Sequence, residues 1–160
     1  MKTFWLSFGS NIGDSVGMIA QTLEHLRMNE AIVLGAVSSF YITPPWGKLD
    51  QPPFINACCE LTTVLSPEAL LALCLDLEKQ AGRVRKEKWG PRCLDIDLLV
   101  CDFINSYQSP MLTLPHPHML ERPFVLQPLA EIAGDLLVKG KTISDWAAEK
   151  FDSEVKPVTL

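Results

Sequence analysis

Long hydrophobic runs, paired cysteine motifs and glycosylation sequons are all missing from this sequence of 160 residues. No apolar run reaches the ~20 residues that a transmembrane helix needs, so we expect no membrane association. The five cysteines are an odd number without a CxxC pair, which predicts reduced thiols in a cytoplasmic protein rather than a disulfide framework. A strand-like run begins already at Thr3, and we therefore expect no signal or transit peptide.

Basic residues are also in the minority. The chain has 14 lysines and arginines against 19 aspartates and glutamates, a formal net charge of -5. Nucleic-acid-binding domains present a basic surface, which this balance does not favour. Five of the 14 cations nevertheless lie within residues 82–92, namely Arg83, Arg85, Lys86, Lys88 and Arg92. Such clustering in an acidic chain predicts a local anion-binding loop.

Two aspartates follow this basic loop inside a predicted strand, Leu94–Cys101. Because successive strand side chains alternate between faces, Asp95 and Asp97 share one face of the sheet. They stand roughly 6–7 Å apart along the strand, close enough for two metal ions about 3.5–4 Å apart. Mg²⁺ takes one or two carboxylates together with phosphate oxygens, while arginines bind the remaining phosphate charge. The pattern predicts a metal-dependent polyphosphate site; the alternative is a solvated loop before a strand with one polar face.

Hydrophobic periodicity along the rest of the chain predicts an α+β fold. The expected strands are Thr3–Phe8, Ala31–Ile42, Phe54–Leu65 and Leu94–Cys101, with a short strand pair in Phe103–Leu114 that turns at Asn105-Ser106. The expected helices run from Val16 to about Asn29, from Ser66 to Gly82, over Phe124–Ala133 and over Thr142–Lys150, and Gly9–Asp14 is expected to form a turn and helix cap. The order β-α-β-β-α-β with extra C-terminal helices predicts a ferredoxin-like, antiparallel sheet with helices packed on it. A length of 160 residues predicts a single domain over residues 1–160.

Two short motifs imitate well-known sites without their context. Pro115-His116-Pro117-His118 offers two imidazoles, but no second ligand pair accompanies them, and structural zinc needs four ligands. Residues 134–142 end in Gly-Lys-Thr like a P-loop, but the glycines are six positions apart instead of five and no strand–loop–long helix unit surrounds them. Neither zinc nor a P-loop is therefore predicted.

Several spaced motifs carry a family resemblance. One runs from Trp89 to Leu99 and reads Trp-Gly-Pro-Arg-x-x-Asp-Ile-Asp-Leu-Leu. The others are Gly9-Ser10-Asn11, Tyr41-x-Thr43-Pro44-Pro45, Gln51-Pro52-x-Phe54-x-Asn56, Pro115-His116-Pro117 and Glu121-Arg122-x-Phe124. Together they resemble the 6-hydroxymethyl-7,8-dihydropterin pyrophosphokinase family of folate biosynthesis, along nearly the whole chain. The resemblance implies transfer of pyrophosphate from ATP to the hydroxymethyl group of the pterin, with AMP as the leaving group.

The resemblance also implies roles for individual residues. Asp95 and Asp97 would hold two Mg²⁺ ions, and Arg83 and Arg92 would stabilise charge in the transition state. The pterin would contact Thr43, Pro44, Trp46, Phe54, Asn56 and Phe124, with its ring between the two phenylalanines. The nucleotide would contact Glu78, Arg83, Arg85, Trp89, Arg92, Leu98, Thr113, His116 and Arg122. From the residues alone, Glu78 could equally anchor the basic loop by an ion pair, and Asn56 could equally satisfy a neighbouring strand. Two positions depart from the family pattern: Lys88 stands where arginine is usual, and His118 where a cation is common.

The fold by itself leaves other functions open, because ferredoxin-like sheets serve many of them. A nucleic-acid-binding domain is the first alternative, opposed by the pI of about 5.1, the lack of an aromatic RNP-like motif and the two aspartates. A metal-dependent phosphohydrolase is the second. With ATP and the pterin as partners we expect a monomer without nucleic acid, and a Gly82–Arg92 loop that closes as a lid over bound nucleotide. The sequence offers no candidate for a dedicated general base, and none is named.

Overall fold

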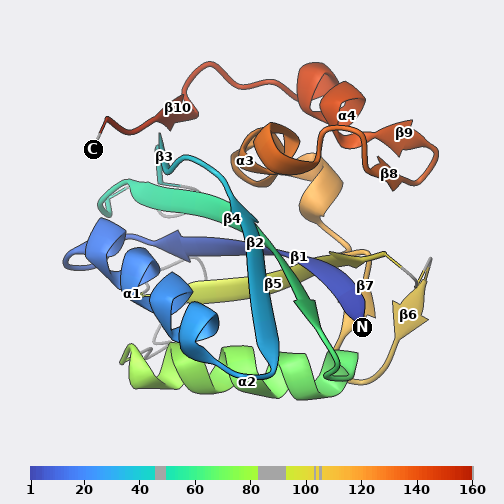
Figure 1. Ribbon diagram of the computed structural model, residues 1–160. Coiled ribbons are helices and arrows are strands. Elements are labelled where there is room, and N and C mark those ends of the chain that lie inside the picture. Colours follow the sequence, from blue (N-terminus) through green and yellow to red (C-terminus); the bar gives the residue numbers. More distant parts are fainter. Residues whose placement is uncertain (46–49, 83–92, 103, 105, 160) are drawn as a thin grey trace.

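The computed structural model describes residues 1–45, 50–82, 93–102, 104 and 106–159 (Figure 1). Its strands are β1 (Lys2–Ser10), β2 (Ile32–Val37), β3 (Tyr41–Thr43), β4 (Phe54–Thr63), β5 (Asp95–Cys101), β6 (Tyr107–Gln108), β7 (Thr113–Leu114), β8 (Leu137–Val138), β9 (Lys141–Thr142) and β10 (Lys156–Pro157). Its helices are α1 (Ser15–Met28), α2 (Pro67–Gln80), α3 (Pro123–Ala133) and α4 (Ile143–Glu149), with a short 3₁₀ helix at Met119–Glu121.

One antiparallel sheet forms the centre of the molecule. Its strand order is β10-β3-β4-β1-β5, and β2 pairs with another part of β4. Counting β2 and β3 together as one strand, this is the order of a ferredoxin-like β-α-β-β-α-β unit. The predicted α+β fold is therefore confirmed, with β10 added at the edge beside β3.

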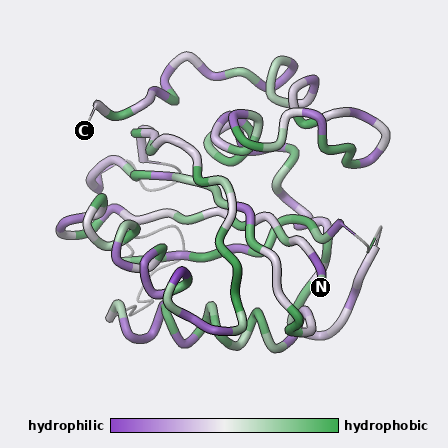
Figure 2. The backbone as a smooth tube through the Cα atoms, viewed as in Figure 1, coloured by the Kyte–Doolittle hydropathy of each residue, from purple (hydrophilic) through white to green (hydrophobic). Residues whose placement is uncertain are grey.

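Helices cover both faces of the sheet, α1 and α2 on one and α3 and α4 on the other (Figure 1). Alternation along β1 supplies both layers: Phe4, Leu6 and Phe8 enter the core under α1 and α2, whereas Trp5 enters the core with α3 and α4. Along α2, hydrophobic and hydrophilic residues alternate at helical spacing (Figure 2). The helix thus presents one apolar face to the sheet and a polar face to solvent.

Side-chain caps determine where three of the helices begin. The Ser66 hydroxyl accepts the N–H of Ala69 before α2, and the Thr142 hydroxyl accepts the N–H of Asp145 before α4. Both starts agree with the capping signals in the sequence. Asp14 caps α1 in the same way, as predicted, but Gly9 and Ser10 still belong to β1, so the turn after this strand begins later than predicted.

Two predicted elements differ from the structure. The single strand predicted over Ala31–Ile42 is divided into β2 and β3, because the pairing with β4 shifts between Leu34 and Val37 and the Ser38 hydroxyl accepts the N–H of Cys58. The strand pair predicted within Phe103–Leu114 is β6 and β7, and it turns at residues 109–112, where the N–H of Ser109 donates to the carbonyl of Leu112 over 2.8 Å. Of the two residues at which the turn is predicted, Asn105 lies outside the described residues and Ser106 precedes β6. Proline at the second position of that turn fixes φ at the value that a β-turn needs.

The segment that imitates a P-loop is a β-hairpin. Strands β8 and β9 pair through Val138 and Lys141, and the two residues between them, Lys139 and Gly140, have φ values of 49° and 86°. Two consecutive positive φ values are typical of a tight type I′ hairpin turn, in which glycine is favoured. No helix in the described part of the chain has the length and apolarity needed to cross a membrane.

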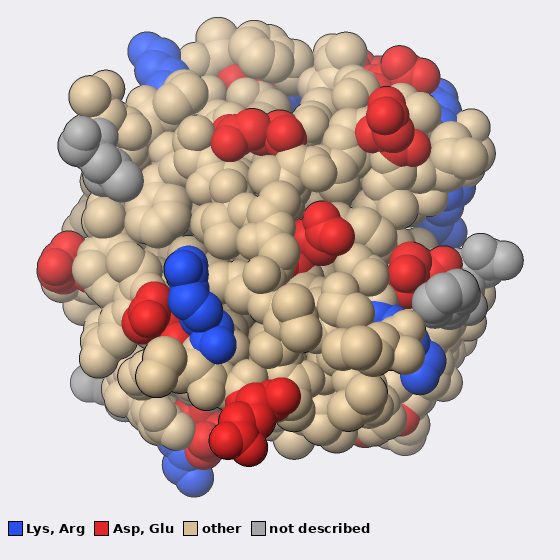
Figure 3. All heavy atoms as spheres, in the orientation of Figure 1, with Lys and Arg blue, Asp and Glu red and all other residues tan. Residues whose placement is uncertain are grey.

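Acidic and basic side chains of the described residues are interspersed over the face seen in Figure 3. Basic side chains stand apart from one another on this face, and acidic ones lie between them. This distribution agrees with the formal net charge of -5 and gives no extended basic stripe on this face.

Candidate active site

The candidate site lies on the sheet face that carries α3. Residues paired across antiparallel strands point to the same face, so the pairs of β1 with β4 and β5 define rows of neighbouring side chains. In one row Gly9 lies between Asn56 and Asp95. In the next row Ser7 lies between Cys58 and Asp97. The two aspartates therefore share a face, as the sequence predicts, and a residue without a side chain separates Asp95 from Asn56.

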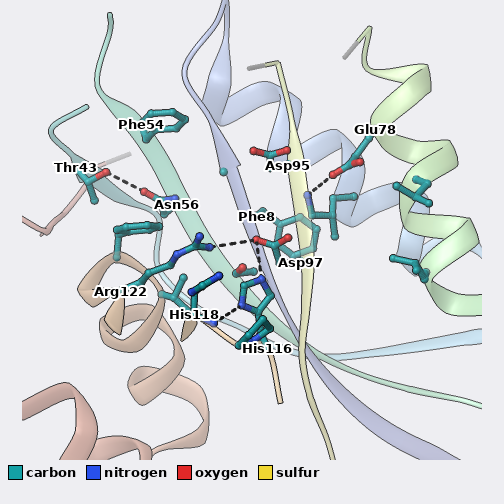
Figure 4. Close-up of a pocket in the computed structure, with 18 of the residues that line it drawn as sticks. Phe8, Thr43, Phe54, Asn56, Glu78, Asp95, Asp97, His116, His118 and Arg122 are labelled. Atoms are coloured by element: carbon teal, nitrogen blue, oxygen red, sulfur yellow. Dashed lines mark hydrogen bonds and ion pairs between the residues drawn. The ribbon is translucent and has the colours of Figure 1, made fainter. Parts of the chain in front are cut away.

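A cavity of about 540 Å³ opens above these rows, between the sheet, α2 and α3 (Figure 4). Its volume falls within the range of ligand-binding clefts. The cavity brings together ten of the predicted site residues: Thr43, Pro44, Phe54, Asn56, Glu78, Asp95, Asp97, His116, Arg122 and Phe124. They come from segments far apart in the sequence, which the sheet register and the two helices place around one space.

Leu98 and Thr113, also predicted to contact the nucleotide, line a second cavity of about 300 Å³. The two cavities share Asp97 and His116 in their walls, so they meet at the carboxylate and imidazole. Apolar side chains such as Leu71 and Met111 line much of the second cavity.

Asp97 is the electrostatic centre of the site. Its Oδ2 lies 3.9 Å from Nη1 of Arg122 and 4.0 Å from Nε2 of His116. In Figure 4, Arg122 approaches from the α3 side and His116 from the segment before the 3₁₀ helix. The Asp97 side chain is 41% exposed and lines the cavity, so a charged ligand in the cavity can contact the carboxylate directly. Arg122 also lies over the Phe124 ring, 5.9 Å from the centroid, in cation–π geometry.

His116 is arranged as a neutral hydrogen-bond donor. Burial lowers its pKa below the ordinary value of 6.5, and the positive charge of Arg122 and His118 lowers it further, although Asp97 acts in the opposite direction. Its Nδ1 accepts the backbone N–H of His118 over 3.1 Å. In the neutral imidazole the proton must then lie on Nε2, which faces Asp97 and the cavity.

The aromatic end of the cavity contains the predicted pterin residues. The Thr43 hydroxyl donates to Oδ1 of Asn56 over 3.0 Å, and both side chains are buried. This bond orients the carboxamide and leaves its Nδ2 directed toward Gly9, where an added Cβ would lie 3.1 Å from it. Asn56 thus does accept a hydrogen bond from the neighbouring strand β3, as the alternative interpretation of the sequence expects, and its side chain also lines the cavity.

Glu78 has a role that the sequence prediction did not include. Its side chain is only 4% exposed, and its Oε2 accepts the backbone N–H of Ile96 over 2.7 Å. Ile96 lies between Asp95 and Asp97, so this contact fixes the strand segment that carries both carboxylates. Helical spacing in the sequence could have indicated that Glu78 faces the cavity, since Leu71 and Glu78 are seven residues apart on α2 and both line it.

The donors present suit a hard divalent cation. Asp95 and Asp97 offer carboxylate oxygens from one strand face, which Mg²⁺ prefers over nitrogen or sulfur. No group of three or more histidine, cysteine or acidic side chains in the described part of the chain is placed to hold a metal by itself. Phosphate and water oxygens would therefore complete the coordination, as is usual for Mg²⁺ with nucleotides.

Several predicted contacts lie outside the described residues. They are Trp46, Arg83, Arg85, Trp89 and Arg92. Lys88 and, apart from Gly82, the predicted Gly82–Arg92 lid also lie outside them. His118, the other departure from the family pattern, is described: it is exposed, and its Nδ1 lies 3.9 Å from Oε2 of Glu121.

The chain is similar to known proteins along most of its length. Residues 5–134 match the family model described as 7,8-dihydro-6-hydroxymethylpterin-pyrophosphokinase (HPPK). The chain is 44% identical over 158 residues to the 2-amino-4-hydroxy-6-hydroxymethyldihydropteridine pyrophosphokinase of Methylorubrum extorquens, covering 99% of each chain. It is 42% identical over 128 residues to the Bacillus subtilis protein of the same name, covering 80% of this chain and 76% of that one.

A solved structure shows the same fold. The chain superposes on wild-type Plasmodium falciparum HPPK-DHPS with a TM-score of 0.71 at 13% identity, which covers 100% of this chain and 48% of that one. The chain thus spans about half the length of this structural relative.

Proposed function

The chain belongs to the 7,8-dihydro-6-hydroxymethylpterin-pyrophosphokinase family, and we propose that the cavity between the sheet, α2 and α3 is where its two substrates meet. The enzyme transfers a pyrophosphoryl group from ATP to 6-hydroxymethyl-7,8-dihydropterin, a step of folate biosynthesis. The chemistry of the cavity supports an assignment of its residues to each substrate.

The observation that carries the proposal is the row Asn56–Gly9–Asp95. A carboxamide suited to a pterin edge and a carboxylate suited to Mg²⁺ stand on the two strands flanking β1, roughly 10 Å apart at the backbone. Gly9 between them adds no side chain, which leaves the sheet surface open at that point. A flat bicyclic ring with a hydroxymethyl arm fits between these groups, with its arm directed toward Asp95.

The pterin would bind at the aromatic end of the cavity. Phe54 and Phe124 would stack on its two faces, and the Asn56 carboxamide would donate and accept at its edge. Thr43 would hold the carboxamide in this orientation through their 3.0 Å hydrogen bond. Pro44 completes the wall, and Trp46 remains a predicted contact.

ATP would extend from the carboxylates into the second cavity. The adenine would lie among the apolar side chains near Leu98 and Thr113, and the triphosphate would pass Asp97 and His116, which line both cavities. His116, with its Nε2–H, and Arg122 would donate to phosphate oxygens. Asp95 and Asp97 would hold two Mg²⁺ ions, which neutralise charge on the triphosphate when they are bound.

Transfer forms a bond between the pterin hydroxymethyl oxygen and the β-phosphorus and breaks the bond from that phosphorus to the oxygen of the α-phosphate, so AMP leaves. Such a reaction depends on positioning and charge neutralisation more than on covalent catalysis. Arg122 and His116 supply positive charge or a donor beside Asp97. Arg83 and Arg92 would add charge stabilisation in the transition state.

We further propose that residues 1–160 act as one pyrophosphokinase domain and as a monomer in the cytoplasm. A reducing compartment suits an odd number of cysteines without a CxxC pair.

The proposal is tested by following ATP labelled at its β-phosphate. We expect the label to enter a pterin diphosphate, with one AMP formed for each, only when Mg²⁺ and the pterin are both present. Label recovered in ADP, free phosphate or pyrophosphate without pterin would indicate a phosphohydrolase instead. Tight binding of single-stranded RNA without binding of Mg²⁺–ATP would support the nucleic-acid alternative.

A further inference from the structure

Helix α3 carries three polar or aromatic side chains along one stripe, at Phe124, Gln127 and Glu131. Spacings of three and seven residues place side chains on the same side of a helix. Phe124, in the first turn, lines the cavity. Gln127 and Glu131, one and two turns further on, do not line it, and both make hydrogen bonds to distant parts of the chain.

Glu131 bonds to β3 and to the segment just before it. Its Oε1 accepts the Tyr41 hydroxyl over 2.7 Å, and its Oε2 accepts the backbone N–H of Ser39 over 2.8 Å and the Ser39 hydroxyl over 3.1 Å. Tyr41 and Thr43 belong to the same short strand, so Glu131 links α3 to the strand that forms the opposite wall of the cavity.

Gln127 makes a second connection through the C-terminal segment. Its Oε1 accepts the N–H of Asp152 over 2.9 Å, and its Nε2 donates to the carbonyl of Val155 over 3.3 Å. Immediately afterwards β10 pairs with β3, and the N–H of Val158 donates to the carbonyl of Phe40 over 2.7 Å. Residues 152–158 thereby connect the middle of α3 to the outer edge of β3 (Figure 1).

Pro128 makes these connections more important. Proline has no N–H, so α3 lacks the helical hydrogen bond from residue 128 to the carbonyl of Phe124. The helix ladder alone therefore constrains Phe124 less than it constrains a residue in an uninterrupted helix. Contacts made by the following turns then determine where the first turn lies relative to β3.

We infer that Glu131 and Gln127 are positioning residues of the pterin subsite, which set the separation of its two walls by tying α3 to β3 and β10. This inference rests on the proposed function, because it takes Phe124 and Thr43 as walls of the pterin pocket. The pterin ring needs Phe54 and Phe124 at a fixed separation, and Phe54 is paired with Thr43 of β3. Gln127 and Glu131 with their hydrogen bonds, called the brace below, lie one and two turns from Phe124 and do not line the cavity. The hydrogen bonds of Glu131 and Gln127 do not involve α2 or β5, which form the ATP side of the cavity; Arg122, at the start of α3, is the proposed ATP contact that they could affect.

The test measures binding of the pterin and of Mg²⁺ with a non-hydrolysable ATP analogue, separately, by calorimetry. The variants are Glu131→Gln, which places an amide donor among the Tyr41 and Ser39 donors, and Gln127→Ala, which removes both bonds to residues 152–155. A hydrogen bond contributes about 0.5–1.5 kcal/mol and tenfold in affinity corresponds to about 1.4 kcal/mol, so we expect each variant to raise the pterin Kd about 3- to 10-fold. The Kd of the ATP analogue should rise less than that of the pterin, because Arg122 is the proposed ATP contact at the start of α3 and the other described ones lie elsewhere.

Thr142→Ala is the matched control, since it removes the cap of α4 and lies outside the brace and the cavity. It should lower the melting temperature and leave both Kd values unchanged. Combining Glu131→Gln with Phe124→Ala gives the decisive readout. If Glu131 acts by positioning Phe124, its effect on pterin binding should vanish once that ring is gone.

Three results would overturn the inference. In the first, Glu131→Gln lowers the melting temperature as Thr142→Ala does and leaves the pterin Kd unchanged. In the second, the effects of Glu131→Gln and Phe124→Ala simply add. In the third, Phe124→Ala alone leaves the pterin Kd unchanged, which refutes the pterin assignment of the cavity and is thereby distinguished from failure of the brace. If Glu131→Gln does not fold, Tyr41→Phe removes one bond of the same brace and is subject to the same criteria.

Discussion

Replacing Gly9 by alanine tests the open position between the pterin and metal ends of the site. A Cβ at Gly9 would lie 3.1 Å from Nδ2 of Asn56, closer than ordinary van der Waals contact. Asn56 is only 7% exposed, and its Oδ1 accepts the Thr43 hydroxyl over 3.0 Å. The carboxamide would therefore have to move by a few tenths of an ångström, away from the orientation that this bond maintains.

The effect of Gly9→Ala on the free energy of unfolding is the sum of two opposing contributions. Replacing glycine by alanine restricts the unfolded chain. This raises the free energy of unfolding by about 0.4–1 kcal/mol where the folded backbone accepts a side chain. Gly9 does not have a positive φ, so its backbone tolerates a side chain. Weakening one buried hydrogen bond costs about 0.5–1.5 kcal/mol. These terms nearly cancel, and we expect the melting temperature to change little.

Pterin binding should change much more, because the methyl group occupies space over which the ring would lie. We expect the pterin Kd to rise about 10-fold or more, which corresponds to about 1.4 kcal/mol, with Mg²⁺–ATP binding nearly unchanged. Calorimetry with each ligand measures both effects.

Gly35→Ala provides the control. Gly35 lies in β2, outside the cavity lining, and an added Cβ there would lie 3.3 Å from the carbonyl oxygen of Glu60, a similarly close contact. Normal pterin binding by Gly9→Ala, or equal loss in the two alanine variants, would refute the placement of the pterin over Gly9.

Three further predictions concern other residues of the structure. Phe54→Ala should weaken pterin binding by about 1–3 kcal/mol, by analogy with base–aromatic stacking, and leave ATP binding unchanged; equal losses for both ligands in calorimetry would indicate a structural role instead. Glu78→Ala should lower the free energy of unfolding by about 1–3 kcal/mol in urea titrations, because the buried N–H of Ile96 loses its 2.7 Å acceptor, and an unchanged midpoint would contradict this. Burial and the hydrogen bond to Glu131 raise the pKa of Tyr41 from 10.0 to about 12, so its stabilising contribution is complete below pH 10 and is lost as the pH rises toward 12. The stability difference between wild type and Tyr41→Phe should therefore shrink over that range, and a constant difference would show that the pKa of Tyr41 is not raised.

Local patterns in the sequence predict much of the site. Alternation along one strand places Asp95 and Asp97 on the same face, and the register with Gly9 and Ser7 agrees. Capping residues predict where α2 and α4 begin, because a cap depends only on its own first turn. The family resemblance adds a prediction of residues at the opposite end of the cavity, including Phe54 and Asn56, and both line it.

What local patterns miss depends on contacts between distant residues. Glu131 reaches residues 90 and 92 positions away, one in β3 and one just before it, within the segment where an uninterrupted strand is predicted. Glu78 meets Ile96 across 18 positions, so its backbone contact follows only from the packing of α2 on β5. The turn at residues 109–112 is different, since Ser109-Pro110 is itself a turn signal that the prediction at Asn105-Ser106 overlooked.

The central claim, that Asp95 and Asp97 hold the metal-bound triphosphate beside the pterin, is tested most directly by single-turnover formation of AMP. The wild type is compared with Asp97→Asn, which keeps the size of the side chain and removes its charge, at several Mg²⁺ concentrations. Metal ions contribute several kcal/mol of charge stabilisation, so we predict that the variant forms AMP roughly 10²- to 10³-fold more slowly, with pterin binding and the far-ultraviolet spectrum unchanged. A near-normal rate of AMP formation by folded Asp97→Asn at moderate Mg²⁺ would contradict the account.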